Sequence, residues 1–262
     1  MSVYTLGIDV GSTTSKCVVL KNGLELISKS LLTSGTGTSG PEKAINAVLE
    51  TAGIPETDIC YSIATGYGRQ SKGLADSDMS ELSCHAMGAH FLYPGVKTVI
   101  DIGGQDIKAM HIDNGALASF QMNDKCAAGT GRFLEVMAKV LEVDINELGM
   151  LGAQSVNPVQ ISSTCTVFAE SEVISQLSKG AAVPDIIAGI HRSVSSKVSG
   201  LVHRVGLMEP MLMTGGVTRN QDVVKSLEVD LNCKIIISEL SQYAGAIGAA
   251  IYAYKKGSKI KE

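Results

Sequence analysis

The chain has 262 residues and a formal net charge of −4, which is enough length for one large domain or two of medium size. Apolar residues make up 45% of it and aromatic residues only 4%, with 28 glycines and no tryptophan, as in α/β folds whose strands and helices approach closely. The absence of a basic cluster argues against a nucleic-acid-binding protein, and no apolar run is long enough to span a membrane.

The amino-terminal residues predict a cytoplasmic protein. They run directly into a strand pattern, without the basic and apolar regions of a secretory signal. In that compartment the six cysteines are expected to be thiols, metal ligands or redox groups rather than structural disulfides.

The first third of the chain predicts a β-meander followed by a helix. Residues 3–31 read as three strands joined by tight turns, and Asn22-Gly23 is a strong hairpin signal. A loop rich in Gly, Ser and Thr spans 33–40, and Pro41 suits the first position of the helix that follows. The further elements expected here are a strand at 59–64, a Gly-rich turn at 65–69 and a helix around 80–93.

The second part of the chain predicts a similar opening and then mostly helices. Pro94-Gly95 is the best domain boundary, and strands are expected from there to about residue 121. The elements expected after it are helices centred on 130–142, 167–179, 184–206 and 220–228, strands near 210–213 and 234–237, and a closing helix at 244–254. We therefore expect two α/β lobes with mixed sheets, residues 1–94 and 95–262, where a carboxy-terminal helix at about 243–256 could return to the first lobe.

Two short segments carry the chemistry. In residues 6–16 an apolar strand pattern ends near Asp9, and a turn of Gly, Ser and Thr leads into a second strand. Residues 99–106 repeat this pattern around Asp101. Turn glycines let backbone N–H groups approach an anion, and an Asp at such a turn can hold a hydrated Mg²⁺. One such turn alone could be an ordinary hairpin, but two in this order predict two half-sites for a nucleoside triphosphate.

The residues of these segments predict distinct roles. We expect Asp9 and Asp101 to hold Mg²⁺ through water, and Gln105 to orient the attacking water. Lys16 is expected to neutralise phosphate charge, although a lysine in a strand can also simply be solvated. The residues expected to contact phosphate are Gly11, Ser12, Thr13, Thr14, Ser15, Gly103 and Gly104. A third turn at a strand end, Gly215-Gly216-Val217, is expected to line an adenosine pocket.

With three such turns in this order, the chain resembles the actin-like ATPase superfamily. The segments 123–133 and 161–172, which contain Cys126 and Cys165, are similar to those of the activators (component A) of 2-hydroxyacyl-CoA dehydratases. The resemblance covers essentially the whole chain and implies two ribonuclease-H-like, actin-like lobes with a nucleotide cleft between them. It alone suggests that Gln242 reaches the base.

The six cysteines fall into two groups. Spacing alone would make Cys126 and Cys165 buried thiols, because they lack close metal-ligand spacing. The resemblance instead implies that they are cluster ligands: two cysteines per chain cannot complete a Cys₄ site, whereas a twofold-symmetric homodimer can share one [4Fe–4S] cluster. The four cysteines expected to be structural are Cys17, Cys60, Cys84 and Cys233.

The activity that the resemblance implies is ATP-driven electron transfer. An oxygen-sensitive homodimer in anaerobic amino-acid fermentation would take an electron from ferredoxin or flavodoxin. Driven by hydrolysis of ATP to ADP, it would pass the electron at low potential to an (R)-2-hydroxyacyl-CoA dehydratase. The alternatives are an ATPase subunit of a benzoyl-CoA-type reductase, a small-molecule kinase of the same fold, and a non-redox ATPase switch.

Overall fold

The computed structural model describes residues 2–162 and 165–260, and its internal contacts divide the chain into two compact units. Unit 1 runs to Val96 and includes Ile112–Ala118 and the segment from Ser238 onward, while unit 2 comprises Lys97–His111 and Ser119–Ile237. The sequence placed one boundary after residue 94. Residues 112–118 and the carboxy-terminal segment also belong to unit 1. Their membership depends on contacts between residues far apart in the chain.

Unit 1 is built on a mixed sheet with the strand order β3-β2-β1-β4-β5. Its strands are β1 (Tyr4–Val10), β2 (Ser15–Lys21), β3 (Glu25–Leu32), β4 (Ile59–Thr65) and β5 (Ser77–Asp78). Its helices are α1 (Gly40–Ala52), α2 (Glu81–Leu92) and α8 (Ala244–Ile260), with short 3₁₀ turns η1 (Glu56–Asp58) and η3 (Ser241–Tyr243). Asn22 and Gly23 both have positive φ, 54° and 70°, as the predicted tight hairpin between β2 and β3 requires.

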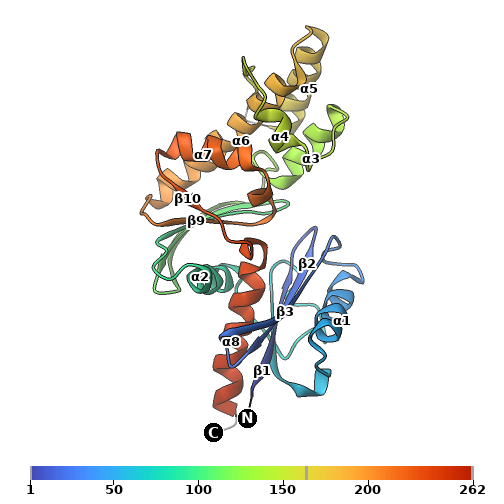
Figure 1. Cartoon of the computed structure of the whole chain (residues 1–262), viewed down its shortest axis with the longest axis vertical. Helices are drawn as coiled ribbons and strands as arrows, with labels where there is room; N and C mark the ends of the chain where they lie inside the picture. The colour runs from blue at the N-terminus through green and yellow to red at the C-terminus, as the bar shows by residue number, and fades with distance from the viewer. Residues whose placement is uncertain (1, 163–164, 261–262) are drawn as a thin grey trace. The chain divides into compact units, whose positions relative to one another are not determined.

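Helices cover both faces of this sheet (Figure 1). On β2, Cys17 and Val19 join the core under α1, whereas Val18 and Leu20 join the core under α8. This alternation follows from the two-residue period of a strand. Because both faces are buried, the middle of β2 is an unbroken apolar run, Cys17–Leu20, and β1 is mostly apolar as well.

Glycines let α8 approach its neighbours in unit 1. A Cβ atom on Gly88 of α2 would lie 1.8 Å from the carbonyl oxygen of Ala244, and one on Gly248 of α8 would lie 1.8 Å from that of Cys84. These distances are far below van der Waals contact, and the obstacles are backbone atoms. The two helices therefore pack closely at a pair of reciprocal glycine contacts.

We expect Gly248→Ala to lower the free energy of unfolding by about 2 kcal/mol or more, because an added methyl group forces the helices apart. Urea or thermal unfolding measures the change. The matched control is Gly200→Ala in α6, where only Arg204 Nη1 lies near the new Cβ, at 3.8 Å, and alanine favours the helix. Equal stability of the two variants would contradict the packing argument.

Unit 2 has a second mixed sheet with the strand order β10-β9-β6-β7-β8. The strands of this sheet are β6 (Thr98–Ile102), β7 (Ile107–Asp113), β8 (Ala116–Asn123), β9 (Met211–Thr214) and β10 (Ile235–Ile236); the end of β7 and the start of β8 belong to the segment Ile112–Ala118 that is counted with unit 1. Its helices are α3 (Gly131–Val140), α4 (Leu148–Gly152), α5 (Thr166–Ser178), α6 (Val183–Val205), the 3₁₀ turn η2 (Gly216–Arg219) and α7 (Gln221–Leu231). The sequence did not predict α4, because its five residues are too few to show a helical period.

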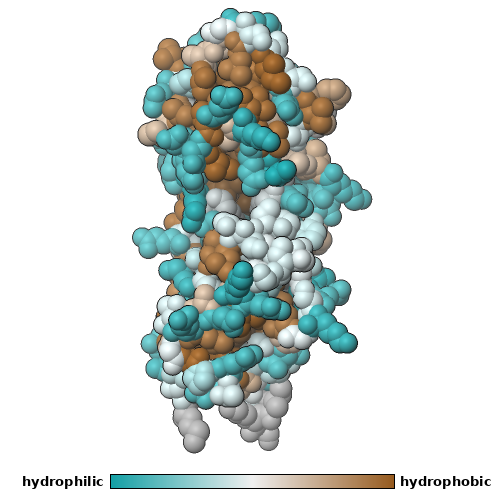
Figure 2. Space-filling model, turned by 90° about the vertical axis from the view of Figure 1, so that its right-hand side faces the viewer, coloured by the Kyte–Doolittle hydropathy of each residue, from teal (hydrophilic) through white to brown (hydrophobic). Residues whose placement is uncertain are grey.

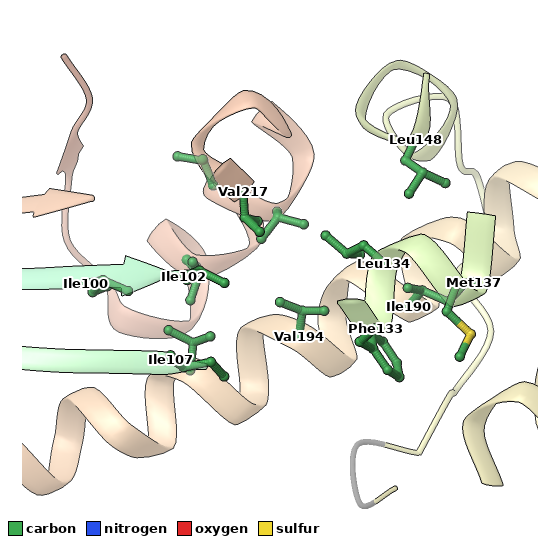
Figure 3. Packing of buried hydrophobic residues seen from close by; sticks show 14 of the residues in the cluster. Ile100, Ile102, Ile107, Phe133, Leu134, Met137, Leu148, Ile190, Val194 and Val217 are labelled. Carbon is green, nitrogen blue, oxygen red and sulfur yellow. The ribbon is translucent and has the colours of Figure 1, made fainter. Parts of the chain in front are cut away.

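One apolar core lies beneath the end of this sheet where β6 turns into β7. Figure 3 shows Ile102 and Ile107, which flank the turn between β6 and β7, near Val194 of α6 and Val217 of η2, with Phe133 of α3 farther along. The core therefore connects the β6–β7 turn with three other segments of unit 2. No helix within the described ranges is long and apolar enough to cross a lipid bilayer.

Candidate functional site

The turn between β1 and β2 presents free backbone donors. It is closed by a hydrogen bond of 2.9 Å from the N–H of Gly11 to the carbonyl oxygen of Thr14. Within the described part of the chain, the N–H groups of Ser12, Thr13 and Thr14 donate no hydrogen bond. Ser15 differs from these residues: its hydroxyl is buried and donates to the carbonyl oxygen of Ser34 at 2.6 Å, so its side chain braces the turn.

Asp9 lies buried at the start of this turn. Its Oδ2 atom is 3.3 Å from Nζ of Lys16, which sits directly opposite it on β2. A Cβ atom on Gly66 would come within 2.7 Å of Oδ1, and one on Gly245 within 2.9 Å of Oδ2. Two glycines thus allow the backbone to pass close to the carboxylate of Asp9. This close packing leaves the carboxylate little freedom to move.

The turn between β6 and β7 repeats this geometry in unit 2. The N–H of Gly103 donates to the carbonyl oxygen of Asp106 at 2.9 Å. As in the first turn, the next three N–H groups, those of Gly104, Gln105 and Asp106, donate no hydrogen bond to any described residue. Gln105 is exposed at the tip. Successive unpaired N–H groups of this kind form an anion-binding concavity.

Asp101 lies buried at the start of the second turn. Its Oδ2 atom is 3.3 Å from Nζ of Lys108, and its Oδ1 atom accepts a hydrogen bond of 2.9 Å from the hydroxyl of Thr214. Gly215 follows with φ of 87°, and a Cβ atom there would lie 2.2 Å from the carbonyl oxygen of Ile102. Only glycine permits this close approach of the two turns.

The strand registers show that the two half-sites are built alike. Each contains an Asp, a Lys opposite it on the antiparallel strand and a Thr opposite it on the parallel strand, followed by a glycine of positive φ. The two sets are Asp9, Lys16, Thr65 and Gly66 in unit 1, and Asp101, Lys108, Thr214 and Gly215 in unit 2. The sequence analysis missed Lys108, although its distance from Asp101 along the chain equals that of Lys16 from Asp9.

The residues predicted to contact adenosine lie in different units. Gly215 directly follows β9 and is the N-cap of η2, which Gly216 and Val217 begin, in unit 2. Gln242 lies in η3, which belongs to unit 1. The first three residues thus form a continuous turn beside Asp101, whereas the role of Gln242 stays a prediction from resemblance.

The oxygen atoms around Asp101 fit a magnesium ion. Mg²⁺ prefers carboxylate and hydroxyl oxygens or waters held by them. Asp101 and Asp106 are both buried, and both contact Lys108, at 3.3 and 2.7 Å. The two buried carboxylates therefore offer oxygen atoms of the kind that Mg²⁺ prefers, directly or through water.

Cys126 and Cys165 occupy different kinds of position in unit 2. Cys165 is the N-cap residue of α5, and its side chain caps no backbone N–H, so the positive end of the helix favours a thiolate or an anionic cluster there. Cys126 does not begin a helix. Thr130 is the N-cap of α3, and Cys126 lies in the preceding loop, where its carbonyl oxygen accepts from the amide of Asn123 at 2.8 Å. Ser163 and Thr164, within the second cysteine motif, lie outside the described residues.

The remaining cysteines are less suited to bind a metal. Burial raises the pKa of Cys17 and of Cys84 to about 12. Burial, with the carboxylates of Glu209 and Glu228, also raises the pKa of Cys233. A raised pKa disfavours the thiolate that binds iron. Cys60 packs against α8, where a Cβ atom on Gly257 would lie 3.2 Å from its sulfur. Cys126 and Cys165 are partly exposed thiols in loop and helix-cap positions, so the donor set fits two cluster ligands per chain.

The second turn is bonded directly to the segment that carries Cys126. The N–H groups of Gly131 and Arg132 donate to the carbonyl oxygens of Gly103 and Gly104, at 2.9 and 2.8 Å. The amino end of α3 is thereby attached to the turn whose other face offers free donors. Since α3 also packs against α5, whose N-cap is Cys165, both cysteine segments are connected to this turn through packed elements.

Helix α5 exposes apolar side chains beside Cys165. Val167, Phe168 and Ile174 are 66%, 65% and 50% exposed. Figure 2 shows apolar side chains at the surface of the end of unit 2 where Figure 1 places α5. Large exposed apolar side chains grouped on one helix are typical of a surface that another protein covers.

Two α/β units with matching aspartate-bearing hairpin turns define the class of actin-like ATPase folds. A ROK family glucokinase from Streptomyces griseus shares this fold with a TM-score of 0.59 at 16% identity, over 96% of this chain and 99% of the glucokinase. The chain belongs to the BadF/BadG/BcrA/BcrD ATPase family, whose model matches residues 6–253.

Relatives of much higher identity lie within this family. The (R)-2-hydroxyglutaryl-CoA dehydratase activating ATPase of Acidaminococcus fermentans is 62% identical over 260 residues, which is 99% of this chain and 100% of the relative. The crystal structure of component A of that dehydratase has a TM-score of 0.95 over 98% of this chain and 100% of its own. The activator of the 2-hydroxyisocaproyl-CoA dehydratase from Clostridium difficile, with bound ADPNP, also has a TM-score of 0.95, at 50% identity over 99% and 97% of the two chains.

Proposed function

We propose that this chain is an ATP-hydrolysing activator that delivers an electron to a 2-hydroxyacyl-CoA dehydratase. The full-length identity of 62% to such an activator supports this function. The observation that carries it is the pair of backbone hydrogen bonds from Gly131 and Arg132 to the β6–β7 turn. They connect a turn suited to phosphate with the loop that contains Cys126, so a change at the nucleotide can reach the redox centre.

The nucleotide contacts come from three turns. The free N–H groups of residues 12–14 and 104–106 bind phosphate oxygens, and the ammonium of Lys16 neutralises phosphate charge. Asp9 and Asp101 hold Mg²⁺ through water, while residues 215–217, with Gln242, line the adenosine pocket. Gln105, exposed at the tip of its turn, orients the water that attacks the γ-phosphate.

The redox centre forms from two copies of the chain. Cys126 and Cys165 supply two thiolates, and the twofold axis of a homodimer supplies two more, which completes a Cys₄ site. A [4Fe–4S] cluster held there supplies one-electron transfer. The exposed apolar side chains of α5 next to Cys165 support the burial of this region against another protein. The electron comes from ferredoxin or flavodoxin and leaves to the dehydratase.

Anaerobic purification followed by iron, sulfide and mass measurements tests this function. We expect about two iron atoms and two sulfides per chain in a dimer, because one four-iron cluster is shared by two chains. The dimer should also hydrolyse ATP and activate a 2-hydroxyacyl-CoA dehydratase when given reduced ferredoxin.

A metal-free protein, even after anaerobic reconstitution with iron and sulfide, would contradict the electron-transfer function. Phosphorylation of a small-molecule acceptor would then identify a kinase of the same fold. About four iron atoms per monomer would contradict the shared site, because the second pair of ligands would have to come from the same chain.

A further inference from the structure

The loop that leads into α1, residues 34–40, is bonded to the turn between β1 and β2; we call it the α1 loop. The N–H of Thr36 donates to the carbonyl oxygen of Gly11 at 3.0 Å, and the carbonyl oxygen of Ser34 accepts from the hydroxyl of Ser15 at 2.6 Å. The α1 loop therefore holds the turn at both of its ends. We propose that this loop is a positioning element that aims the free N–H groups of the first turn at phosphate. This inference rests on the proposed nucleotide binding but not on the cluster.

The contacts of the α1 loop fix the direction of two peptide groups in the turn. In a trans peptide the C=O and N–H bonds point in opposite directions. The carbonyl oxygen of Gly11 faces the N–H of Thr36, so the N–H of Ser12, in the same peptide, points away from the loop. The carbonyl oxygen of Ser12 also lies against the loop, because a Cβ atom on Gly35 would be 2.4 Å from it. The N–H of Thr13 therefore points away from the loop as well.

Gly35 is the residue of the α1 loop that lies closest to the turn. A Cβ atom there would lie 2.4 Å from the carbonyl oxygen of Ser12 and 2.5 Å from that of Gly11. Gly35 lies outside the left-handed region of backbone conformation, so this close approach is what requires a glycine. Gly37 of the same loop is the opposite case, with φ of 77° and nothing within 4 Å of an added Cβ. The two glycines thus separate close approach from backbone conformation.

Unit 2 holds its turn in the same way. The carbonyl oxygen of Gly103 accepts from the N–H of Gly131 at 2.9 Å. That of Gly104 accepts from the N–H of Arg132 at 2.8 Å. Gly103 and Gly11 occupy the same place in their turns, because the N–H of each donates to the carbonyl oxygen three residues later. In each unit, therefore, a segment at the amino end of a helix holds carbonyl oxygens on one side of the turn and leaves N–H groups free on the other.

The side chain of Thr38 keeps the α1 loop in shape. Its hydroxyl donates to the carbonyl oxygen of Gly35 at 2.7 Å and accepts from the N–H of Gly40 at 3.0 Å. Thr38 itself is exposed and lies outside the turn. A substitution at Thr38 can therefore loosen Gly35 without placing a new atom against the turn.

Hydrogen exchange with and without ADP tests the inference. Anaerobically purified protein is labelled, with and without saturating ADP and Mg²⁺, for times short enough to resolve unprotected amides. ADP-induced protection is then compared in peptides that cover residues 12–14 and 104–106. In Gly35→Ala the added Cβ pushes the α1 loop off the turn, so we expect protection of 12–14 to be lost and that of 104–106 to remain. The dissociation constant of ADP should rise on the order of tenfold, the effect of losing one hydrogen bond to a charged group.

Three further variants separate positioning from structure. Gly37→Asn is the matched control in the same loop, because asparagine tolerates positive φ and the position is open; protection of both turns should stay unchanged. Thr38→Val removes the hydrogen bond to Gly35, so we expect a smaller loss of protection at 12–14, which Thr38→Ser restores by keeping the hydroxyl. Melting temperatures show whether each variant folds; if Gly35→Ala does not, the two Thr38 variants decide.

Unchanged protection of 12–14 in Gly35→Ala would overturn the inference. Equal losses of protection at 12–14 and 104–106 would also overturn it, because they would show a general structural effect. Where the Thr38 variants decide, equal protection in Thr38→Val and Thr38→Ser would have the same consequence. Absence of ADP-induced protection from both turns of the unchanged protein would instead contradict the proposed function itself.

Discussion

Replacing Cys126 or Cys165 with alanine is expected to abolish activation of the dehydratase while ADP affinity stays within about twofold. In the proposed dimer each substitution removes two of the four ligands of the shared cluster, one from each chain, so no Cys₄ site can form. The turns proposed to bind phosphate do not contain either cysteine, and their free N–H groups depend on the β1–β2 and β6–β7 hairpins. Nucleotide binding should therefore survive the loss of iron.

Four measurements on one preparation check this division. Iron content and visible absorption report the cluster, ADP titration reports the turns, and a coupled assay with reduced ferredoxin and the dehydratase reports activation. Cys233→Ala is the matched control, since Cys233 is a partly buried thiol of unit 2 whose pKa burial raises. A cysteine variant that retained its iron but lost ADP binding would reverse the roles assigned here.

Gln105→Ala is expected to slow ATP hydrolysis on the order of 100-fold with little change in ADP affinity. A side chain that orients the attacking water acts on the reaction rather than on binding. Gln105 suits such a role because it is exposed between two anchored neighbours. The carbonyl oxygen of Gly104 accepts from Arg132, and that of Asp106 accepts from Gly103, so the tip of the turn is held rigidly.

Single-turnover phosphate release and ADP titration separate the two effects. Gln154→Ala serves as a control, because Gln154 is also an exposed loop glutamine of unit 2 but lies outside the nucleotide-binding turns. If Gln105→Ala weakened ADP binding as much as it slowed hydrolysis, Gln105 would be a nucleotide contact. An unchanged rate of ATP hydrolysis in Gln105→Ala would show that Gln105 does not orient the attacking water.

The attachment of α3 to the β6–β7 turn shows how one unit can join two functions. Two backbone hydrogen bonds connect Gly131 and Arg132 to Gly103 and Gly104. Backbone contacts of this kind do not depend on side-chain identity, so no residue type in the sequence indicates them. Through these bonds, a change in the position of the turn can be transmitted to the loop that contains Cys126.

Local chemistry was sufficient for much of the prediction. Glycines, hydroxyl residues and an Asp after an apolar run identify both turns, because a tight turn with free N–H groups needs those residue types in that order. Asn22-Gly23 identified its hairpin for a similar reason: both residues tolerate positive φ, which this turn requires. The helices were predicted from apolar periodicity, which a few turns of chain display by themselves.

What the sequence by itself determined, therefore, is the pair of turns, the main strands and helices, and the family resemblance. The tertiary structure alone decided that Lys108 lies buried against two carboxylates, that α8 packs in unit 1, and that Cys126 precedes its helix by a loop. Each of these depends on which distant backbone segments lie side by side. Strand register and glycine contacts set that arrangement, and neither is encoded in any short stretch of residues.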